Sequence, residues 1–264
     1  MKRMVALLRK EVLDLVKHRM VLVTLLLVPS ILTMVALGSV LSLHALPQGE
    51  VSMEELGPLA ASVDCSDLEP SDCLRLSIAA MHRLLYLIIP TTLPTVIAAY
   101  SVVGEKSERT LEALLATPIS TLELLAAKGL AALTPAVLAT WMAAAVHALG
   151  LSTLVGPELL ARVYTPAWLG ALVATVPTLA VASVLLSLLV SSRSVDPRSA
   201  QQLGGFVVVP IVGMLIAQSL GVGVLRAPVL VALTAAALAI DVLLMWLCVQ
   251  VFERESILVR WKGM

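Results

Sequence analysis

The chain has 264 residues, of which 59% are hydrophobic and only 14% are charged, and its mean hydropathy is +0.98. Soluble domains are usually about 45 to 50% apolar, so this composition excludes an ordinary soluble domain and predicts an integral membrane protein. Basic and acidic side chains number eighteen each, so no excess of charge indicates nucleic acid as a partner.

The first element, residues 1–19, is predicted to be an amphipathic helix. Its apolar side chains recur at helical spacing, at Met4, Val5, Leu8, Val12, Leu15 and Val16. A cleaved signal peptide is the alternative, but Glu11 and Asp14 make this segment too acidic, and the apolar run after it, about 27 residues, is too long. We therefore expect a helix that lies in the membrane interface.

Six apolar stretches are long enough to cross a bilayer. A hydrocarbon core of about 30 Å needs roughly 20 helical residues at about 1.5 Å rise per residue. The expected spans are residues 20–46, 84–103, 124–151, 168–191, 203–220 and 228–252. The predicted fold is therefore all-α, a single transmembrane domain over residues 1–264 of a polytopic membrane protein.

The basic residues predict how this bundle lies in the membrane. Six spans place both termini on the same side, and fourteen of the eighteen lysines and arginines fall there. The other side holds Arg75, Arg83, Arg162 and Arg226. Cytoplasmic flanks retain such an excess, so both termini are expected in the cytoplasm and the chain in the cell membrane.

Residues 47–83 form the expected outer loop. A capping box from Ser52 to Glu55 predicts a short helix there. Cys65 and Cys73 lie in the same loop, and an oxidising exterior would permit a disulfide between them. Two free thiols are the alternative. A metal site with the neighbouring acids is less favoured because the ligand spacing does not fit, so no metal is expected.

The insert at residues 104–120, between the second and third spans, is charged and amphipathic. Acids recur at helical spacing at Glu105, Glu108 and Glu112, and a leucine ridge lies beside them at Leu111, Leu114 and Leu115. Pro118 ends this helix, and a capping box from Ser120 to Glu123 begins the third span. Either the helix is a solvated spacer between two spans, or it is a binding site for a cytoplasmic partner. In the second case the leucines would enter a groove of the partner, and the charged side chains would form ion pairs at the rim of that groove.

Within the spans, three features stand out as candidates for function. Pro90 and Pro94 lie one turn apart and form the best candidate for a hinge, although a structural kink is the plainer interpretation. Gly213 and Ala217 share a small-residue pattern that predicts close helix packing. Asp241 is the one acid deep in a predicted span, where a carboxylate is functional by default, unless it is neutral, paired or shallower than expected.

A family resemblance joins these observations. The segment GEKSERTLEALLATPIS, residues 104–120, resembles the coupling-helix signature in the permease subunits of type-2 ATP-binding-cassette (ABC) exporters. The segments at residues 7–19, 191–205 and 252–262 resemble the connecting helix, the inner loop and the C-terminal ending of the same family.

The resemblance implies a permease that works as a homodimer, or as a heterodimer with a similar permease, on two cytoplasmic ABC ATPase subunits. The implied contacts to the ATPase are Glu105, Lys106, Glu108, Arg109, Leu111, Glu112, Leu114 and Leu115. It also implies that the stripe with Gly213 and Ala217 lies near the pathway or the dimer contact. From their own chemistry, we assign Pro90, Pro94 and Asp241 to the same group of candidates. The chain has no GxxxxGK[ST] phosphate loop, so it is expected not to be an enzyme itself, with ATP and Mg²⁺ held by the partner.

The expected substrate is lipid-like, amphipathic or drug-like, because the spans are poor in charge and in aromatic side chains. Sodium efflux and membrane-protein maturation are alternatives within the family. An ion-coupled carrier would need several midplane polar groups, and Asp241 alone supports it. An intramembrane enzyme would need a convergent catalytic set, which is not evident. A scaffold subunit would use the insert for assembly only.

Overall fold

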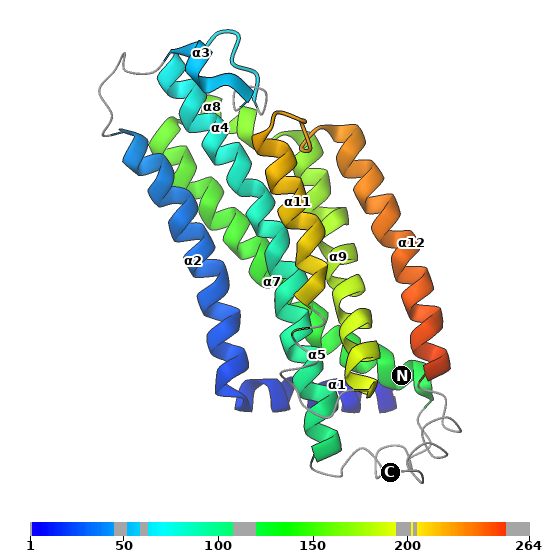
Figure 1. Cartoon of the computed structure of the whole chain (residues 1–264). Coiled ribbons are helices and arrows are strands. Elements are labelled where there is room, and N and C mark those ends of the chain that lie inside the picture. The colour runs from blue at the N-terminus through cyan, green and yellow to red at the C-terminus, as the bar shows by residue number, and fades with distance from the viewer. Residues whose placement is uncertain are drawn as a thin grey trace.

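The computed structural model describes residues 2–44, 52–58, 63–107, 120–193, 202 and 205–251. All the regular elements in these ranges are helical, and five helices are long and apolar enough to cross a membrane. The all-α polytopic fold is therefore confirmed. Viewed from the side, the long helices run between two ends of one bundle (Figure 1).

Helix α1 (Lys2–Lys17) lies crosswise under one end of the bundle, and α2 (Arg19–His44) rises from it (Figure 1). Leu7 and Glu11 face the bundle and are buried, whereas Val5, Val12 and Val16 are exposed. The predicted amphipathic helix is thus present. Its valines remain free for a lipid interface, and a different face contacts the protein.

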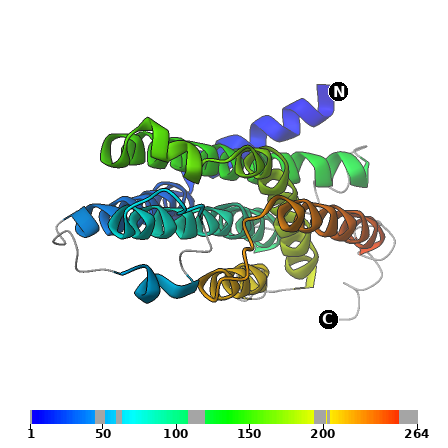
Figure 2. The same cartoon turned by 90° about the horizontal axis from the view of Figure 1, so that it is seen from above.

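The second span is much longer than predicted. Instead of residues 84–103, the structure has α4 (Pro70–Leu85), a 3-10 turn η2 (Tyr86–Ile88) and α5 (Ile89–Ser107) in direct succession. The outer loop is correspondingly shorter than residues 47–83, and its predicted short helix is α3 (Met53–Leu56). Figure 2 shows the reason: α4 and α5 lie between α7 and α11, so protein rather than lipid surrounds them and polar residues are tolerated.

The third and fourth predicted spans correspond to helices that are each a little longer than predicted and are candidate spans. They are α7 (Thr121–Val155) and α9 (Pro166–Arg193), joined through the short helix α8 (Pro157–Val163). The predicted capping box begins α7, since the Glu123 amide donates to Ser120 Oγ at 3.2 Å and the Ser120 amide to Glu123 Oε2 at 3.0 Å. Small residues recur at four-residue spacing along α7 and are buried, at Ala132, Ala136, Thr140 and Ala144, which allows close helix packing.

The fifth predicted span, residues 203–220, is described from residue 205. It consists of a 3-10 turn η3 (Gly205–Val207) and α11 (Val208–Ser219), and this described part is apolar. The sixth, α12 (Ala227–Val251), has full length and packs along α9. The described residues therefore hold five full-length candidate spans and one shorter apolar helix, where six spans were predicted.

Removal of the Ser120 cap tests how α7 begins. We expect Ser120→Ala to lower the free energy of unfolding by about 1 kcal/mol, because the Glu123 amide loses its acceptor. Thermal unfolding in detergent measures the effect. Ser152→Ala, near the other end of α7, removes a hydroxyl that bonds only to the Leu149 carbonyl and is the matched control. Equal melting temperatures for the two variants would contradict the capping role.

Candidate functional site

The predicted coupling residues lie at the boundary of what the structure describes. Helix α5 extends to Ser107, so the backbone of Glu105 and Lys106 belongs to its last turns. The other six lie outside the described residues: Glu108, Arg109, Leu111, Glu112, Leu114 and Leu115. The structure does describe the two helices that flank them, α5 and α7, which pack against each other.

Three side chains form a closed ring at this flank. Lys128 Nζ, from α7, donates to Glu11 Oε1 of α1 at 2.9 Å and to Ser101 Oγ of α5 at 2.8 Å. The Ser101 hydroxyl donates to the second carboxylate oxygen, Glu11 Oε2, at 2.7 Å. Each member comes from a different helix, so the ring connects α1 to both helices that flank the insert.

The ring is shielded from water. The side chains of Lys128 and Glu11 are only 2% and 5% exposed. Burying two opposite charges is tolerated when they pair closely and their remaining hydrogen-bonding positions are filled, as Ser101 does here. Loss of Lys128 would leave the buried Glu11 carboxylate with only a longer ion pair, to Lys10 at 3.7 Å. The ring is therefore a strong constraint on how α1, α5 and α7 are arranged.

Packing around the ring supports the same junction. Leu7 of α1 contacts Leu124 and Ala127 of α7 in a small apolar cluster. The rings of His18 and Tyr100 lie 5.7 Å apart, which brings the start of α2 against α5. The site is thus a rigid three-helix junction next to the insert.

Sequence reasoning missed this ring. Lys128 and Glu11 were both counted among the charges on the cytoplasmic side, without partners. The available signal is a cation eight residues beyond Ser120, inside an otherwise apolar span, because such a charge requires a buried partner. Its partner is 117 residues away in the chain, so only the fold identifies it.

The two candidate hinge prolines lie at the break between α4 and α5. Pro90 has no amide hydrogen, and the helix tightens to a 3-10 turn just before it. The hydroxyls of Thr91 and Thr92 donate to carbonyl oxygens in this turn, at 2.8 Å each for Ile88. Pro94 is buried one turn further on. The helix is therefore irregular at this point, and a hinge movement about the two prolines stays a prediction.

The remaining pathway candidates lie apart from the junction. Asp241 is on α12 and 9% exposed, and its Oδ1 has no hydrogen-bond partner among the described residues. Gly213 is exposed on α11, and a Cβ added there would meet nothing within 4 Å. Ala217, on the same helix, packs against the main apolar core. The structure therefore does not bring these residues to one place with the junction.

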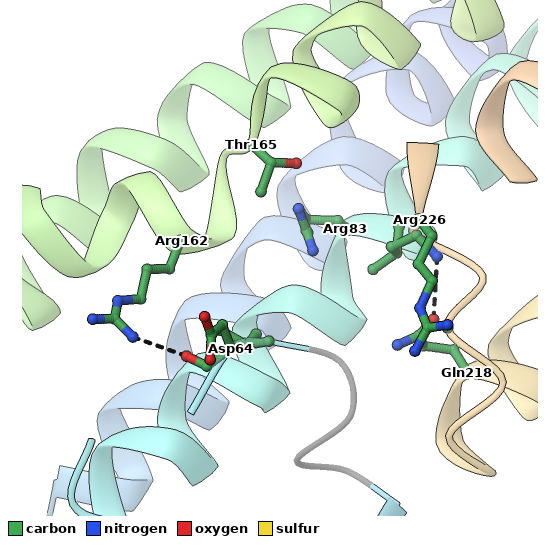
Figure 3. Close-up of a pocket in the computed structure, with 9 residues that line it drawn as sticks. Asp64, Arg83, Arg162, Thr165, Gln218 and Arg226 are labelled. Atoms are coloured by element: carbon green, nitrogen blue, oxygen red, sulfur yellow. Dashed lines mark hydrogen bonds between the residues drawn. The ribbon is translucent and has the colours of Figure 1, made fainter. Parts of the chain in front are cut away.

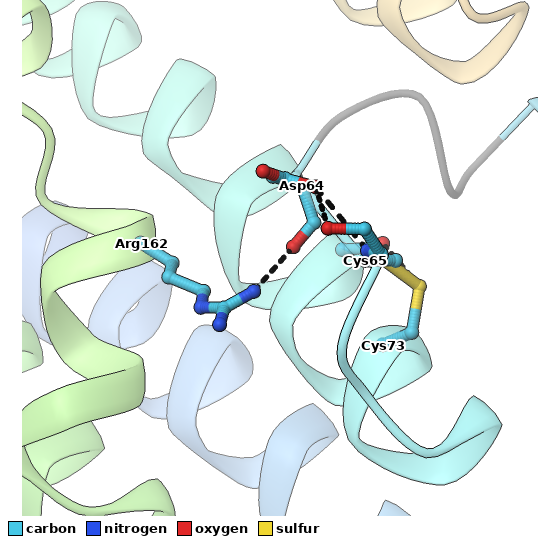
Figure 4. The surroundings of a disulfide bond; sticks show 6 residues. Asp64, Cys65, Cys73 and Arg162 are labelled. Atoms are coloured by element: carbon cyan, nitrogen blue, oxygen red, sulfur yellow. Dashed lines mark hydrogen bonds between the residues drawn. A yellow bond between two sulfur atoms is a disulfide. The ribbon is translucent and has the colours of Figure 1, made fainter.

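Cys65 and Cys73 are joined by a disulfide at the opposite end of the bundle, with their Cα atoms 5.4 Å apart (Figure 4). Asp64 lies beside it. Hydrogen bonds from the Ser66 hydroxyl and amide, and then the charge of Arg162, lower the pKa of the Asp64 carboxyl. This carboxylate therefore remains charged at neutral pH.

Reduction of the disulfide tests its contribution. We expect it to lower the free energy of unfolding by about 2 to 3 kcal/mol, because the cross-link restricts the unfolded chain. Thermal unfolding with and without reductant measures the change. Cys248→Ala, which removes the buried free cysteine, should show the same shift. An unchanged melting temperature, or two thiols open to alkylation without reductant, would contradict the bond.

Comparison with known proteins covers nearly the whole chain. The sequence model of one family, described as ABC-2 family transporter protein, matches residues 5–252. This range contains all three members of the ring and all the described helices, apart from the first three residues of α1. Among curated proteins, none matches the chain.

Proposed function

Because the chain belongs to the ABC-2 family of transporter proteins, we propose that it is the permease subunit of an exporter driven by a separate ATPase. It is a multi-pass membrane protein, and in this proposal both of its termini face the cytoplasm. ATP and Mg²⁺ would be held by the ATPase subunit. The permease would move a lipid-like, amphipathic or drug-like substrate outward.

The observation that carries the proposal is the ring of Glu11, Ser101 and Lys128. It lies beside the insert that would contact the ATPase, and it fixes α1 to both flanking helices. A force on the insert would therefore move α1, α5 and α7 together, and α5 would transmit the movement through η2 to α4. This is the mechanical requirement for coupling ATP hydrolysis to opening of a pathway.

A second permease copy fits the surfaces that a single chain leaves open. Only 11% of the apolar window of α12 and 22% of that of α2 are buried within the chain. Gly213 of α11 is also open, and small residues allow two helices to approach closely. We propose that α11 contributes to the contact between two permeases.

The proposed substrate class follows from the cavities in the sides of the bundle. One of about 420 Å³ lies between α2 and α7, and one of about 450 Å³ lies between α9 and α12. Their walls are mainly alanine, leucine, valine and methionine side chains. Apolar surfaces of this size suit acyl chains or amphipathic molecules.

Reconstitution with the ATPase subunit tests the function. We expect vesicles that hold both proteins to hydrolyse ATP, to hydrolyse it faster with lipid-like or amphipathic compounds, and to transport those compounds. Stimulation by sodium or by a membrane-protein client would favour those alternatives within the family. Hydrolysis by the permease alone, or labelling of a Leu114→Cys variant from the external face, would contradict the proposal.

Asp241 is the observation that favours an ion-coupled carrier. If its carboxylate carries a proton or cation, Asp241→Asn should abolish transport driven by an ion gradient, with or without the ATPase. Transport that requires ATP and proceeds at the wild-type rate in Asp241→Asn would exclude that mechanism.

A further inference from the structure

A cavity of about 410 Å³ lies at the end of the bundle remote from α1, and arginines dominate its charge (Figure 3). Arg83 comes from α4, Arg162 from α8 and Arg226 from the turn before α12. These are three of the four arginines that the charge pattern assigned to the outer side. Segments distant in the sequence therefore bring the outer cations to one place.

Arg83 is the buried member of this set. It is 2% exposed, and its Nε donates to the Ala80 carbonyl at 3.2 Å while Nη1 donates to the Val163 carbonyl. Among the described residues, no carboxylate pairs with it. Carbonyl groups orient a guanidinium but do not neutralise it, so a buried cation here lacks a counter-ion.

Gln218 adds an unsatisfied donor to the same cavity. Its side chain is 2% exposed, and Oε1 accepts a hydrogen bond from the Leu225 amide at 3.3 Å. Its Nε2, also buried, has no partner among the described residues. A buried amide donor that faces a cavity is satisfied when a ligand supplies an acceptor.

The other two arginines of the cavity, Arg226 and Arg162, lie at its edge. Arg226 is exposed and forms no ion pair with a described residue; Gly221 and Gly223, with φ of 80° and 69°, make the tight turn before it. Arg162 donates to the Asp64 carbonyl at 2.9 Å and lies 3.8 Å from the exposed carboxylate of Asp67. Such an exposed pair is weak.

The balance of charge in the cavity is positive. Among the described residues that line it, one is an acid, Asp64, and three are arginines, so this lining carries a formal excess of two positive charges. The Asp64 carboxylate already accepts two hydrogen bonds from Ser66. The cavity thus has an unsatisfied donor and an excess of positive charge, and the one carboxylate in its lining is already engaged by Ser66.

We propose that this cavity binds the phosphate oxyanion of a ligand, either the headgroup of an anionic phospholipid or inorganic phosphate. Guanidinium groups match phosphate oxygens in a two-pronged geometry, and Gln218 Nε2 supplies a further donor. Bound phosphate would neutralise Arg83 and satisfy Gln218 at once. The Arg83 guanidinium also lies 5.6 Å from the ring centroid of the buried Trp168, which helps to hold it in place.

The test uses the full chain and two ligands. Inorganic phosphate is titrated into the detergent-purified protein by calorimetry. Separately, the protein is placed in bilayer discs of phosphatidylcholine with and without phosphatidylglycerol, and the lipid retained by it is measured. Arg83→Gln and Arg226→Gln are compared with the wild type. Arg75→Gln is the matched control, since Arg75 is also on α4 but pairs with Asp72 at 2.9 Å and lies outside the cavity lining.

We expect binding to weaken about tenfold in Arg226→Gln and more in Arg83→Gln, and to be unchanged in Arg75→Gln. Saturable binding of inorganic phosphate identifies a solute site, whereas selective retention of phosphatidylglycerol alone identifies a lipid headgroup site. Binding of neither ligand by the wild type overturns the proposal. Wild-type affinity in Arg226→Gln also overturns it, and this exposed substitution leaves the buried packing intact. The measurement needs no ATPase, so its outcome is independent of the transport function.

Discussion

Lys128→Met is expected to lower the free energy of unfolding of the permease by about 3 kcal/mol, because the buried Glu11 carboxylate would keep only its longer ion pair with Lys10, at 3.7 Å. Methionine keeps much of the volume and the apolar stem, so the loss reports the charge rather than a cavity. Chemical or thermal unfolding of the detergent-purified chain measures the change in the free energy of unfolding. In the complex with ATPase, we also expect hydrolysis to continue without proportionate transport.

Two further variants test whether the loss of stability comes from the ring itself or from any change in charge. Lys17→Met removes an exposed cation of α1 and should leave stability within about 0.5 kcal/mol of the wild type. The double variant Glu11→Leu with Lys128→Met removes both charges and should recover most of the stability that the single variant loses. A single variant that is as stable as the wild type would show that the buried pair does not hold the junction.

The second large effect is expected on binding of the ATPase, from substitutions in the leucine ridge of the insert. The combined substitutions Leu111→Ala and Leu114→Ala should weaken binding of the ATPase subunit roughly thirtyfold to a hundredfold, because truncating a buried interface leucine costs about 1 kcal/mol or more. Co-purification and surface binding of the ATPase to the permease measure the affinity. Glu108→Gln should weaken binding less, since a charge at the rim acts mainly on the association rate.

The control for the ridge lies just beyond the insert. Leu122 is exposed in the first turn of α7, and Leu122→Ala should leave ATPase binding and stimulated hydrolysis unchanged. All ridge variants should unfold at the wild-type temperature, which separates docking from folding. Full binding and full transport in the double alanine variant would refute the assignment of the insert as the coupling element.

Hydropathy and local chemistry predicted much of the fold. The long, mostly exposed helices α2 and α12 are nearly uniform in apolar character, so their ends fall close to the predicted residues. The start of α7 was predicted because Ser120 and Glu123 interact locally. Local signals in the sequence are enough to predict where a helix begins and ends when the helix is uniformly apolar, or when its cap is formed by residues close in sequence.

The candidate sites depend on distant contacts and could not be predicted in the same way. Helix α4 carries Arg83 and was assigned to a loop, because a hydropathy window treats a charge as a sign of water even where the surroundings are protein. The partners of Arg83 and Lys128 are carbonyl or carboxylate groups some 80 and 117 residues distant. One sequence specifies such residues but does not show which pairs meet.

The exposed face of α11 has a consequence for the arginine cavity. Val209, Val212 and Ile216 are exposed on this helix, which ends at Ser219, one residue after Gln218. In the proposed dimer this face lies against the second permease, so assembly would bring the partner close to the cavity that Gln218 lines. Formation of the dimer should then change how easily a headgroup reaches the arginines.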